Sequence, residues 1–375
     1  MSLEGFATAE GTARFRERFA GTAAGGHFRM EQGLWLSSIG IGTYLGGWDE
    51  ETDRSYADAI ARAVELGSNV IDTAANYRFQ RSERSVGEAL RRLTSGDFAR
   101  EELLVCTKGG YIPFDSRPPA GQAGVREYVE ETFVKTGVAE LSDIAAGSHC
   151  MTPKYLSHQL AQSLRNMNLD AVDVYYVHNP ETQLQGVSRE EFERRLRAAF
   201  EQLERERSEG RLRFYGAATW NGFRVQEGAR GHHSIERMFQ LAREVGGEAH
   251  GFRFVQLPFN LAMPEALVSD NQPYEGAHVS LLEAAKALGV TVVASASILQ
   301  GKVAKDLPER VRGPMGSLQT DAQTAIQFTR STPGVTTALV GMSRREHVEE
   351  NLQLAHVPTA SHEDYSRLFT QGEDE

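Results

Sequence analysis

Asn69-Val-Ile-Asp72-Thr-Ala-Ala-Asn-Tyr77 is the stretch around which the rest of this chain is organised. Its short apolar run, Val70-Ile71, ends in an acid, and a tyrosine follows five positions after that acid. A helical pattern then begins near Ser82 and contains Gly87. Ligands meet α/β proteins at the carboxyl ends of strands, so an acid at such an end is a candidate functional residue. The alternative is that Asp72 only caps the following turn.

The same alternation of strand and helix continues to the end of the chain. Strands are predicted over residues 39–43, 70–71, 103–107, 172–177, 212–218, 254–257, 291–294 and 337–340. Helices are predicted over 53–66, 82–93, 152–167, 189–209, between 234 and 245, and over 279–288, 321–330 and 345–354. Eight near-continuous apolar strands, each followed by a helix, predict an α/β fold of the (β/α)₈ TIM-barrel type. A doubly wound open sheet is less favoured, because no G-x-G-x-x-G motif follows the first strand.

Four segments lie outside this alternation, and one of them, residues 258–276, ends in a polar, turn-rich run. Residues 1–26 are rich in Ala, Gly, Thr and charge, and are predicted to be a loosely attached N-terminal extension. Residues 27–375 are then a single barrel domain, which begins with a β-hairpin over 27–36. Residues 109–150 are too long for a simple β/α turn and form an insertion after the third strand. Its root carries Tyr111, Ile112 and Phe114, which we expect to line a substrate pocket; the alternative is rim decoration or dimer contacts.

Composition narrows the class of partner. A chain of 375 residues with 40% hydrophobic and 24% charged residues has enough material for a large core. Its net charge of −11 argues against nucleic acid as a partner. The two cysteines, Cys106 and Cys150, offer neither a disulfide framework nor metal-binding spacing, which favours a cytoplasmic location. Neither a secretory signal nor an apolar run of membrane-spanning length is present, so no membrane partner is expected.

Four polar residues are predicted at one end of neighbouring strands. Asp72 ends the second strand, Lys108 follows the third, His178 ends the fourth, and Tyr77 lies in the loop after Asp72. Each also has a structural interpretation: an Asp72–Lys108 ion pair, a rim histidine and a packed aromatic. Their convergence on one face of a barrel predicts an active site. The strand ends carry no carboxylate and histidine cluster, so we predict no metal site and do not favour a metal-dependent isomerase or lyase.

The order of these motifs resembles the aldo-keto reductase superfamily. The resemblance rests on Asp72-Thr-Ala…Tyr77, Ser82-Glu83…Gly87, Lys108, Tyr-Tyr-Val-His178, Gln256 in Val-Gln-Leu-Pro-Phe-Asn260, and Pro333-Gly-Val…Val-Gly341…His347-Val-Glu-Glu350-Asn351. It implies a (β/α)₈ barrel closed at the bottom by an N-terminal hairpin. It also implies that NADP(H) binds without a Rossmann motif and that the enzyme reduces an aldehyde or ketone, its small-molecule carbonyl substrate. The alternative is an NADP(H)-binding regulatory module of the same fold with negligible turnover. The resemblance indicates no particular oligomeric state.

The resemblance also gives the four strand-end residues their roles. Tyr77 is the implied general acid, but a free phenol with a pKa of about 10 is poorly matched to neutral pH. A nearby ammonium favours the phenolate, so Lys108 is expected to lower the pKa of Tyr77. Asp72 would hold Lys108 in place, and His178 would donate a hydrogen bond to the substrate carbonyl. Arg78 stands where a glycine usually follows the catalytic tyrosine, which predicts a cation at the edge of the active site.

Cofactor residues are implied along the second half of the chain. Asn221 or Thr219, with Gln256, would bind the nicotinamide carboxamide, and the backbone of Gly301 would bind the diphosphate. Ser343, Arg344 and Arg345 offer a hydroxyl and two guanidinium groups to a 2′-phosphate. The alternative is that these are ordinary first-turn residues of a helix. The full implied set is Thr219, Asn221, Gln256, Gly301, Gly341, Ser343, Arg344, Arg345, His347, Glu350 and Asn351.

Overall fold

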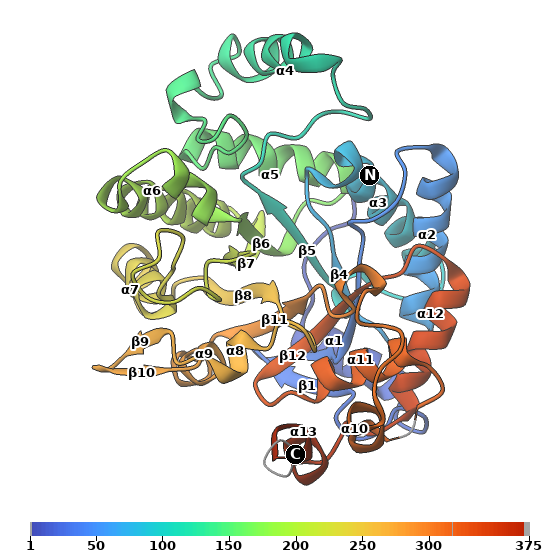
Figure 1. Cartoon of the computed structure of the whole chain (residues 1–375). Helices are drawn as coiled ribbons and strands as arrows, with labels where there is room; N and C mark the ends of the chain where they lie inside the picture. Colours follow the sequence, from blue (N-terminus) through green and yellow to red (C-terminus); the bar gives the residue numbers. More distant parts are fainter. Residues whose placement is uncertain (1, 317, 371–375) are drawn as a thin grey trace.

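A closed barrel of eight parallel strands forms the centre of the computed structural model, which describes residues 2–316 and 318–370 (Figure 1). The strands lie in the order β11-β12-β3-β4-β5-β6-β7-β8 around the barrel. Their bounds are β3 Ile39–Gly42, β4 Val70–Asp72, β5 Leu104–Gly109, β6 Val172–His178, β7 Leu212–Ala218, β8 Phe252–Pro258, β11 Thr291–Ser295 and β12 Val335–Gly341. The predicted TIM barrel is confirmed, and all eight strands occur where the sequence placed them.

A helix follows each strand and covers the outside of the barrel. These helices are α2 Glu50–Glu65, α3 Arg81–Thr94, α5 Pro153–Met167, α6 Arg189–Ser208, α7 Ile235–Gly246, α9 Leu281–Leu288, α11 Asp321–Ser331 and α12 Arg345–Leu352. Local chemistry sets their ends. A capping box between Ser280 and Glu283 begins α9, and Gly289, at φ +65°, ends it. The helix starts later than predicted because Val279 closes the small hairpin of β9 (Gln272–Tyr274) and β10 (Ala277–Val279).

The barrel interior is filled and closed at the bottom. Side chains such as Val174, Tyr176 and Phe254 form one buried apolar cluster inside the barrel, and Leu34 and Leu36 belong to the same cluster. The two leucines come from the hairpin of β1 (Phe28–Glu31) and β2 (Leu34–Ser37). Arg29 fastens this hairpin by donating to the backbone carbonyls of Arg330, Val335 and Thr336. This end of the barrel is therefore plugged, and TIM barrels bind ligands at the opposite end, at the carboxyl ends of the strands.

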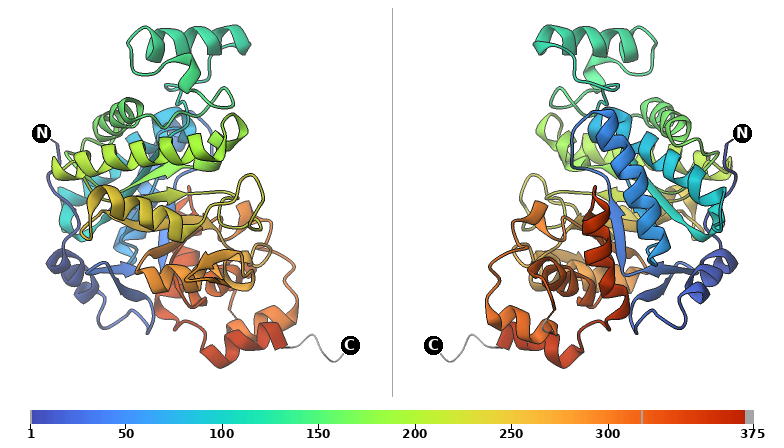
Figure 2. Two further views of the ribbon diagram at one scale, coloured as in Figure 1. Left: turned by 90° about the vertical axis from the view of Figure 1, so that its left-hand side faces the viewer. Right: turned by 90° about the vertical axis from the view of Figure 1, so that its right-hand side faces the viewer.

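The N-terminal residues are docked on the barrel, so the prediction of a loosely attached segment is wrong for residues 2–26. They contain α1, Ala9–Arg18, which lies against the hairpin at the bottom of the barrel (Figure 2). Phe15 is fully buried, and the backbone N–H of Ala7 donates to Asp173 Oδ1 at 2.6 Å. Arg18 pairs with the buried carboxylate of Glu102 at 3.0 Å. The Ala- and Gly-rich composition did not indicate this docking, which depends on Phe15, on Phe19 and on a few polar contacts.

The insertion after β5 projects from the barrel as a separate helical segment (Figure 2). It contains α4, Gly121–Val129, which continues into one π-helical turn. Ile112 and Phe133 form a small apolar cluster with Tyr155 of α5, and Phe114 packs on that cluster. The insertion uses Ile112 to build its own core, so the prediction that Ile112 lines the active site is wrong. The ring of Phe114 lies 6.3 Å from that of Phe79, in the segment after Tyr77, and Tyr111 packs on His178 at the strand ends.

The remaining elements are short or terminal. They are α8 Glu265–Val268, α10 Glu309–Arg312 and α13 His362–Thr370. Both cysteines, Cys106 and Cys150, are buried and unpaired. Within residues 2–316 and 318–370, no helix has the length and apolarity required to cross a membrane.

Candidate active site

Lys108 lies at the centre of a buried polar cluster at the carboxyl ends of β4 and β5. Its ammonium donates to Asp72 Oδ1 at 2.5 Å, to the Thr73 carbonyl at 2.9 Å and to the Tyr77 hydroxyl at 3.3 Å. An ammonium has three N–H donors, so all of them are used. The second oxygen of Asp72 accepts from Gln256 Nε2 at 2.8 Å. This network fixes the lysine, whose side chain is 1% exposed, against the tyrosine.

Burial and charge oppose each other in this cluster. Burial lowers the pKa of Lys108, but Asp72 and Tyr77 raise it further, so the net pKa lies above its usual value and the ammonium stays charged. Burial raises the pKa of Tyr77 by more than Lys108 lowers it, so the net shift is upward. Lys108 thus lowers the pKa of Tyr77 as predicted, but burial outweighs its effect. The Tyr77 hydroxyl therefore keeps its proton at neutral pH and can donate a hydrogen bond.

His178 completes the group of four. It ends β6, is 8% exposed, and its ring lies edge-on to the ring of Tyr77 with centroids 5.8 Å apart. Burial, Lys108 and His149 together hold the pKa of His178 well below its usual value, so the imidazole is neutral. Its Nδ1 is buried without a hydrogen-bond partner among the described residues. The structure thus brings together all four residues predicted at the strand ends.

The three residues after Tyr77 adopt an unusual backbone conformation. Arg78, Phe79 and Gln80 have φ values of +48°, +59° and +68°, in the left-handed region that non-glycine residues rarely occupy. Arg78 donates to Asp53 Oδ1 at 2.5 Å and to the Gly47 carbonyl at 2.7 Å, and its side chain is 1% exposed. The prediction that Arg78 places a cation at the edge of the active site is therefore wrong. The left-handed backbone turns its guanidinium toward α2, where a carboxylate neutralises it.

Of the predicted nicotinamide residues, Thr219 and Asn221 lie in the turn after β7, and Gln256 lies on β8. Thr219 is 4% exposed, and its hydroxyl has no hydrogen-bond partner among the described residues. Asn221 is exposed, and its backbone N–H donates to Glu181 Oε1 at 2.9 Å. The Gln256 amide donates to Asp72, as described above, so its nitrogen already serves the Lys108 cluster.

Gly301 and the residues after β12 form the other part of the predicted cofactor set. The N–H of Gly301 donates to the Ile298 carbonyl at 2.8 Å, inside its own turn. Arg344 and Arg345 line a cavity of about 460 Å³ between α2 and α12. Arg344 bonds to His347 Nε2 at 2.6 Å, and Arg345 pairs with Glu349 at 2.9 Å.

The other members of the predicted cofactor set differ in exposure and in hydrogen-bond partners. Gly341 is exposed at the end of β12, and the Ser343 carbonyl accepts from Ser55 Oγ at 2.5 Å. Glu350 accepts from the hydroxyl of Thr320 at 2.7 Å, so its carboxylate is engaged in holding α11. Asn351 is 4% exposed, and its Oδ1 has no partner among the described residues.

Sequence reasoning missed several residues that shape the site. Glu181 accepts from the backbone N–H groups of Trp220 (2.7 Å) and Asn221 (2.9 Å), and so fixes the turn after β7. The signal for it was its position three residues after His178. His149 donates to the carbonyl of His178 at 2.7 Å, although 29 residues separate them. No local pattern marks His149, because it lies inside the insertion.

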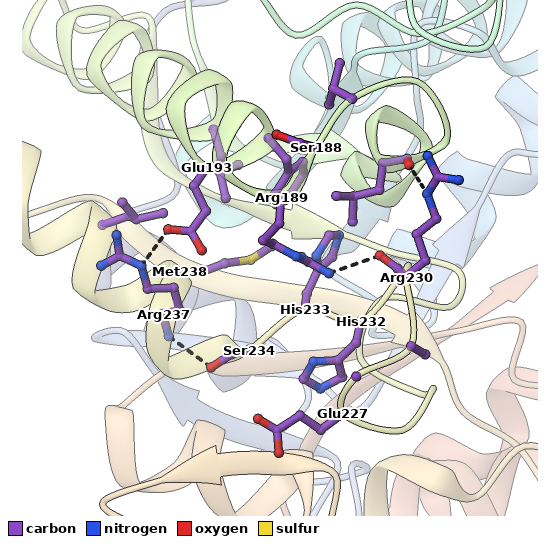
Figure 3. Close-up of a pocket in the computed structure, with 17 residues that line it drawn as sticks. Ser188, Arg189, Glu193, Glu227, Arg230, His232, His233, Ser234, Arg237 and Met238 are labelled. Atoms are coloured by element: carbon purple, nitrogen blue, oxygen red, sulfur yellow. Dashed lines mark hydrogen bonds and ion pairs between the residues drawn. The ribbon is translucent and has the colours of Figure 1, made fainter.

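A second cavity lies away from these residues. It measures about 550 Å³ and lies between α6 and α7, where Arg189 lies beside His233 and donates to the Arg230 carbonyl at 3.0 Å (Figure 3). None of the predicted site residues lines it. No group of histidine, cysteine or acidic side chains suited to a metal ion occurs in the described part of the chain.

The fold and the Lys108 cluster together define a TIM-barrel protein with a buried polar site at the strand ends. The sequence matches the model of the Aldo/keto reductase family over residues 38–312, well over half of the chain. The chain therefore belongs to this family and is an oxidoreductase of carbonyl compounds.

The sequence identity to individual proteins of the family is low. The chain is 30% identical to an NADH-specific methylglyoxal reductase of Escherichia coli over 199 residues, which is 52% of each chain. It is 24% identical to an L-glyceraldehyde 3-phosphate reductase of Escherichia coli, over 90% of this chain and 89% of that one. Among solved structures, an aldo/keto reductase from Klebsiella pneumoniae in complex with NADP and acetate superimposes with a TM-score of 0.60. That match has 19% identity and covers 92% of this chain and 94% of the other. This structural likeness supports the fold.

Proposed function

We propose that this protein is an NADPH-dependent reductase of an aldehyde or ketone, in which Tyr77 is the general acid. The observation that carries the proposal is the contact of the Tyr77 hydroxyl with the Lys108 ammonium, at 3.3 Å. Lys108 is itself held by Asp72 at 2.5 Å. If Asp72 and Lys108 formed only a structural ion pair, they would not need the protonated Tyr77 hydroxyl beside them at the open end of the barrel.

Each residue has a distinct task in this reaction. NADPH, when bound, supplies a hydride to the carbonyl carbon. Tyr77 donates its proton to the carbonyl oxygen, and Lys108 stabilises the phenolate that this leaves behind. Asp72 keeps Lys108 charged and in place. The neutral imidazole of His178 donates a hydrogen bond to the substrate oxygen, which stabilises the negative charge that develops there.

The residues predicted for NADP(H) fit the cofactor in part. The buried atoms Thr219 Oγ1 and Asn351 Oδ1 lack partners within the described residues, and buried polar atoms normally have one. Arg344 and Arg345 beside the cavity of about 460 Å³ supply cations for a 2′-phosphate. Gly301 would have to give up its bond to Ile298 to bind a diphosphate. The Klebsiella pneumoniae relative was crystallised with NADP, which supports the same cofactor here.

Small aldehydes are the substrates we propose to try first. The two relatives from Escherichia coli are named as reductases of methylglyoxal and of L-glyceraldehyde 3-phosphate. Both compounds present an aldehyde on a short carbon chain.

The test is NADPH oxidation by the purified protein against aldehydes, ketones, sugars and pyridoxal. With the best substrate, Tyr77→Phe is expected to lower kcat by about 10²–10⁴-fold, the range for general acid catalysis, and to leave the Kd for NADPH unchanged. Tyr44→Phe is the matched control, since that ring lies 5.0 Å from Tyr77 and is 57% exposed. A Tyr77→Phe variant with a third of the wild-type kcat rules out this acid. Wild-type protein that binds NADPH without oxidising it, even in a single turnover, is a regulatory module instead.

A further inference from the structure

The two ends of the insertion pair with each other above β5. Tyr111 and His149 form an antiparallel bridge. The N–H of Cys150 donates to the Gly110 carbonyl, and the N–H of Ile112 donates to the Ser148 carbonyl, both at 2.8 Å. The root of the insertion is therefore a short two-stranded ladder, fixed independently of the projecting helical part.

This ladder places His149 against the end of β6. His149 is fully buried, and its Nε2 lies 2.7 Å from the backbone carbonyl of His178. On the other side of the ring, Gln183 Nε2 lies 2.8 Å from His149 Nδ1, and Gln183 Oε1 accepts from Arg195 at 2.8 Å. These contacts form one continuous hydrogen-bond chain from Arg195 through Gln183 and His149 to His178.

The direction of this chain is determined by its first donor. Arg195 only donates, so Gln183 Oε1 is the acceptor and the amide nitrogen of Gln183 must donate to His149 Nδ1. His149 Nε2 then carries the proton and donates to the His178 carbonyl. Burial lowers the pKa of His149 to about 4, so the ring stays neutral and Nδ1 remains an acceptor at neutral pH.

Glycine at position 110 is required for this approach. Gly110 has φ +139°, and a Cβ there would lie 2.6 Å from His149 Nε2 and 3.1 Å from the His178 carbonyl oxygen. A methyl group would therefore separate the two histidines. Tyr111 adds a second contact, with its ring edge-on to the His178 ring at 5.1 Å and its hydroxyl 3.2 Å from Asn179 Nδ2.

We propose that His149 is a positioning residue for His178, supplied to the active site by the insertion. The inference rests on the proposed function, because it assumes that the His178 imidazole acts on the substrate. The Nδ1 of that imidazole has no partner in the described structure, so its orientation depends on the backbone of His178 and on the aromatic rings beside it. His149 fixes that backbone at its carbonyl, and a small displacement of a catalytic group greatly lowers the rate.

The first experiment compares His149→Phe with His149→Gln by steady-state kinetics with NADPH and the best aldehyde. The phenyl ring keeps the volume but donates no hydrogen bond, so we expect kcat to fall by about tenfold to a hundredfold. The Kd for NADPH should stay within about twofold, because His149 touches no predicted cofactor residue. The glutamine amide reaches a similar distance and donates, so His149→Gln should keep at least about half of the wild-type kcat.

The matched control is His27→Phe, at the opposite end of the barrel. His27 is also fully buried, and its Nε2 bonds to the backbone carbonyl of Gly67 at 2.9 Å. His27→Phe should lower the free energy of unfolding by about as much as His149→Phe does, but it should not change kcat. A decrease in kcat of equal size for both variants would show a general effect of destabilisation and would overturn the proposal.

A double-mutant cycle separates this inference from the proposed function. His149→Phe should have no further effect on kcat in a His178→Ala background, because it acts through His178. Additive effects would refute the positioning role while leaving the reductase intact. An unchanged kcat for His178→Ala alone would instead refute the role of His178 in the proposed function. If His149→Phe does not fold, Gln183→Met gives the same comparison with a smaller expected loss, because it removes the amide that contacts His149 and Arg195 but keeps the imidazole.

Discussion

The substitution Asp53→Ala should release the strained segment that follows Tyr77. Arg78, Phe79 and Gln80 all have positive φ, from +48° to +68°. Each non-glycine residue in this region costs about 1–2 kcal/mol, so the run stores about 3–6 kcal/mol. The pairing of Arg78 with Asp53 at 2.5 Å is one of the polar interactions that hold this segment in place, beside the bond from Arg78 to the Gly47 carbonyl.

The size of the effect follows from burial. The Arg78 side chain is 1% exposed and Asp53 is 29% exposed, so the pair is largely removed from water. Leaving a buried charge without its partner costs about 3–5 kcal/mol, and the partial exposure of Asp53 favours the lower value. We therefore expect Asp53→Ala to lower the free energy of unfolding by about 3 kcal/mol. It should also lower kcat by about tenfold, because the backbone next to Tyr77 relaxes.

The variant Arg78→Gly provides the decisive comparison. Glycine adopts positive φ without strain and carries no charge to bury, so this substitution should cost little. In the Arg78→Gly background, Asp53→Ala removes only the pairing with Arg81, at 2.5 Å, which should cost about 1 kcal/mol or less.

Urea denaturation measures the free energies, and NADPH oxidation measures kcat. For the free energy of unfolding, the matched control is Asp58→Ala, also on α2, whose pair with Arg92 is 61% exposed at the aspartate and should contribute about 1 kcal/mol or less. An equal cost of Asp53→Ala in the wild-type and Arg78→Gly backgrounds would refute the role assigned to the pair.

Three further predictions concern cofactor choice, acid stability and the insertion. NADPH should bind about tenfold to a hundredfold more tightly than NADH, because charge-assisted bonds to the 2′-phosphate contribute about 1.5–3 kcal/mol. Arg345→Ala should reduce this difference in affinity. Equal Kd values for the two cofactors in fluorescence titrations would contradict the prediction. Burial lowers the pKa of His27 and His149 to about 4, so the unfolded chain takes up their protons at higher pH than the folded chain does. Stability should therefore fall as the pH drops from about 6.5 to 4, by about 3 kcal/mol for each histidine, and urea denaturation of His27→Phe should show a weaker pH dependence than wild type. Replacing residues 117–147 by a short turn should leave a folded, NADPH-binding barrel with a raised KM for substrate; unchanged kinetics with altered oligomerisation on a sizing column would make the insertion an interface element.

The order of secondary structure and the catalytic face were predictable from the sequence. Short apolar strands alternating with amphipathic helices leave few ways to bury every strand, and a closed parallel barrel is one of them. In that fold the residues at strand ends share one face. Asp72, Lys108 and His178 could therefore be grouped before their distances were known. Tyr77 followed from its fixed offset in the loop after Asp72.

Tertiary structure alone decided which partner each polar side chain takes. Gln256 donates to Asp72, Arg78 turns to Asp53, and His149 reaches the carbonyl of His178. The net upward shift in the pKa of Tyr77 likewise depends on burial outweighing the charge of Lys108. A local sequence pattern fixes whether a residue lies in a strand or a helix, because that choice depends on near neighbours. A hydrogen-bond partner or a pKa depends on groups brought together from distant parts of the chain, and on how much water remains around them.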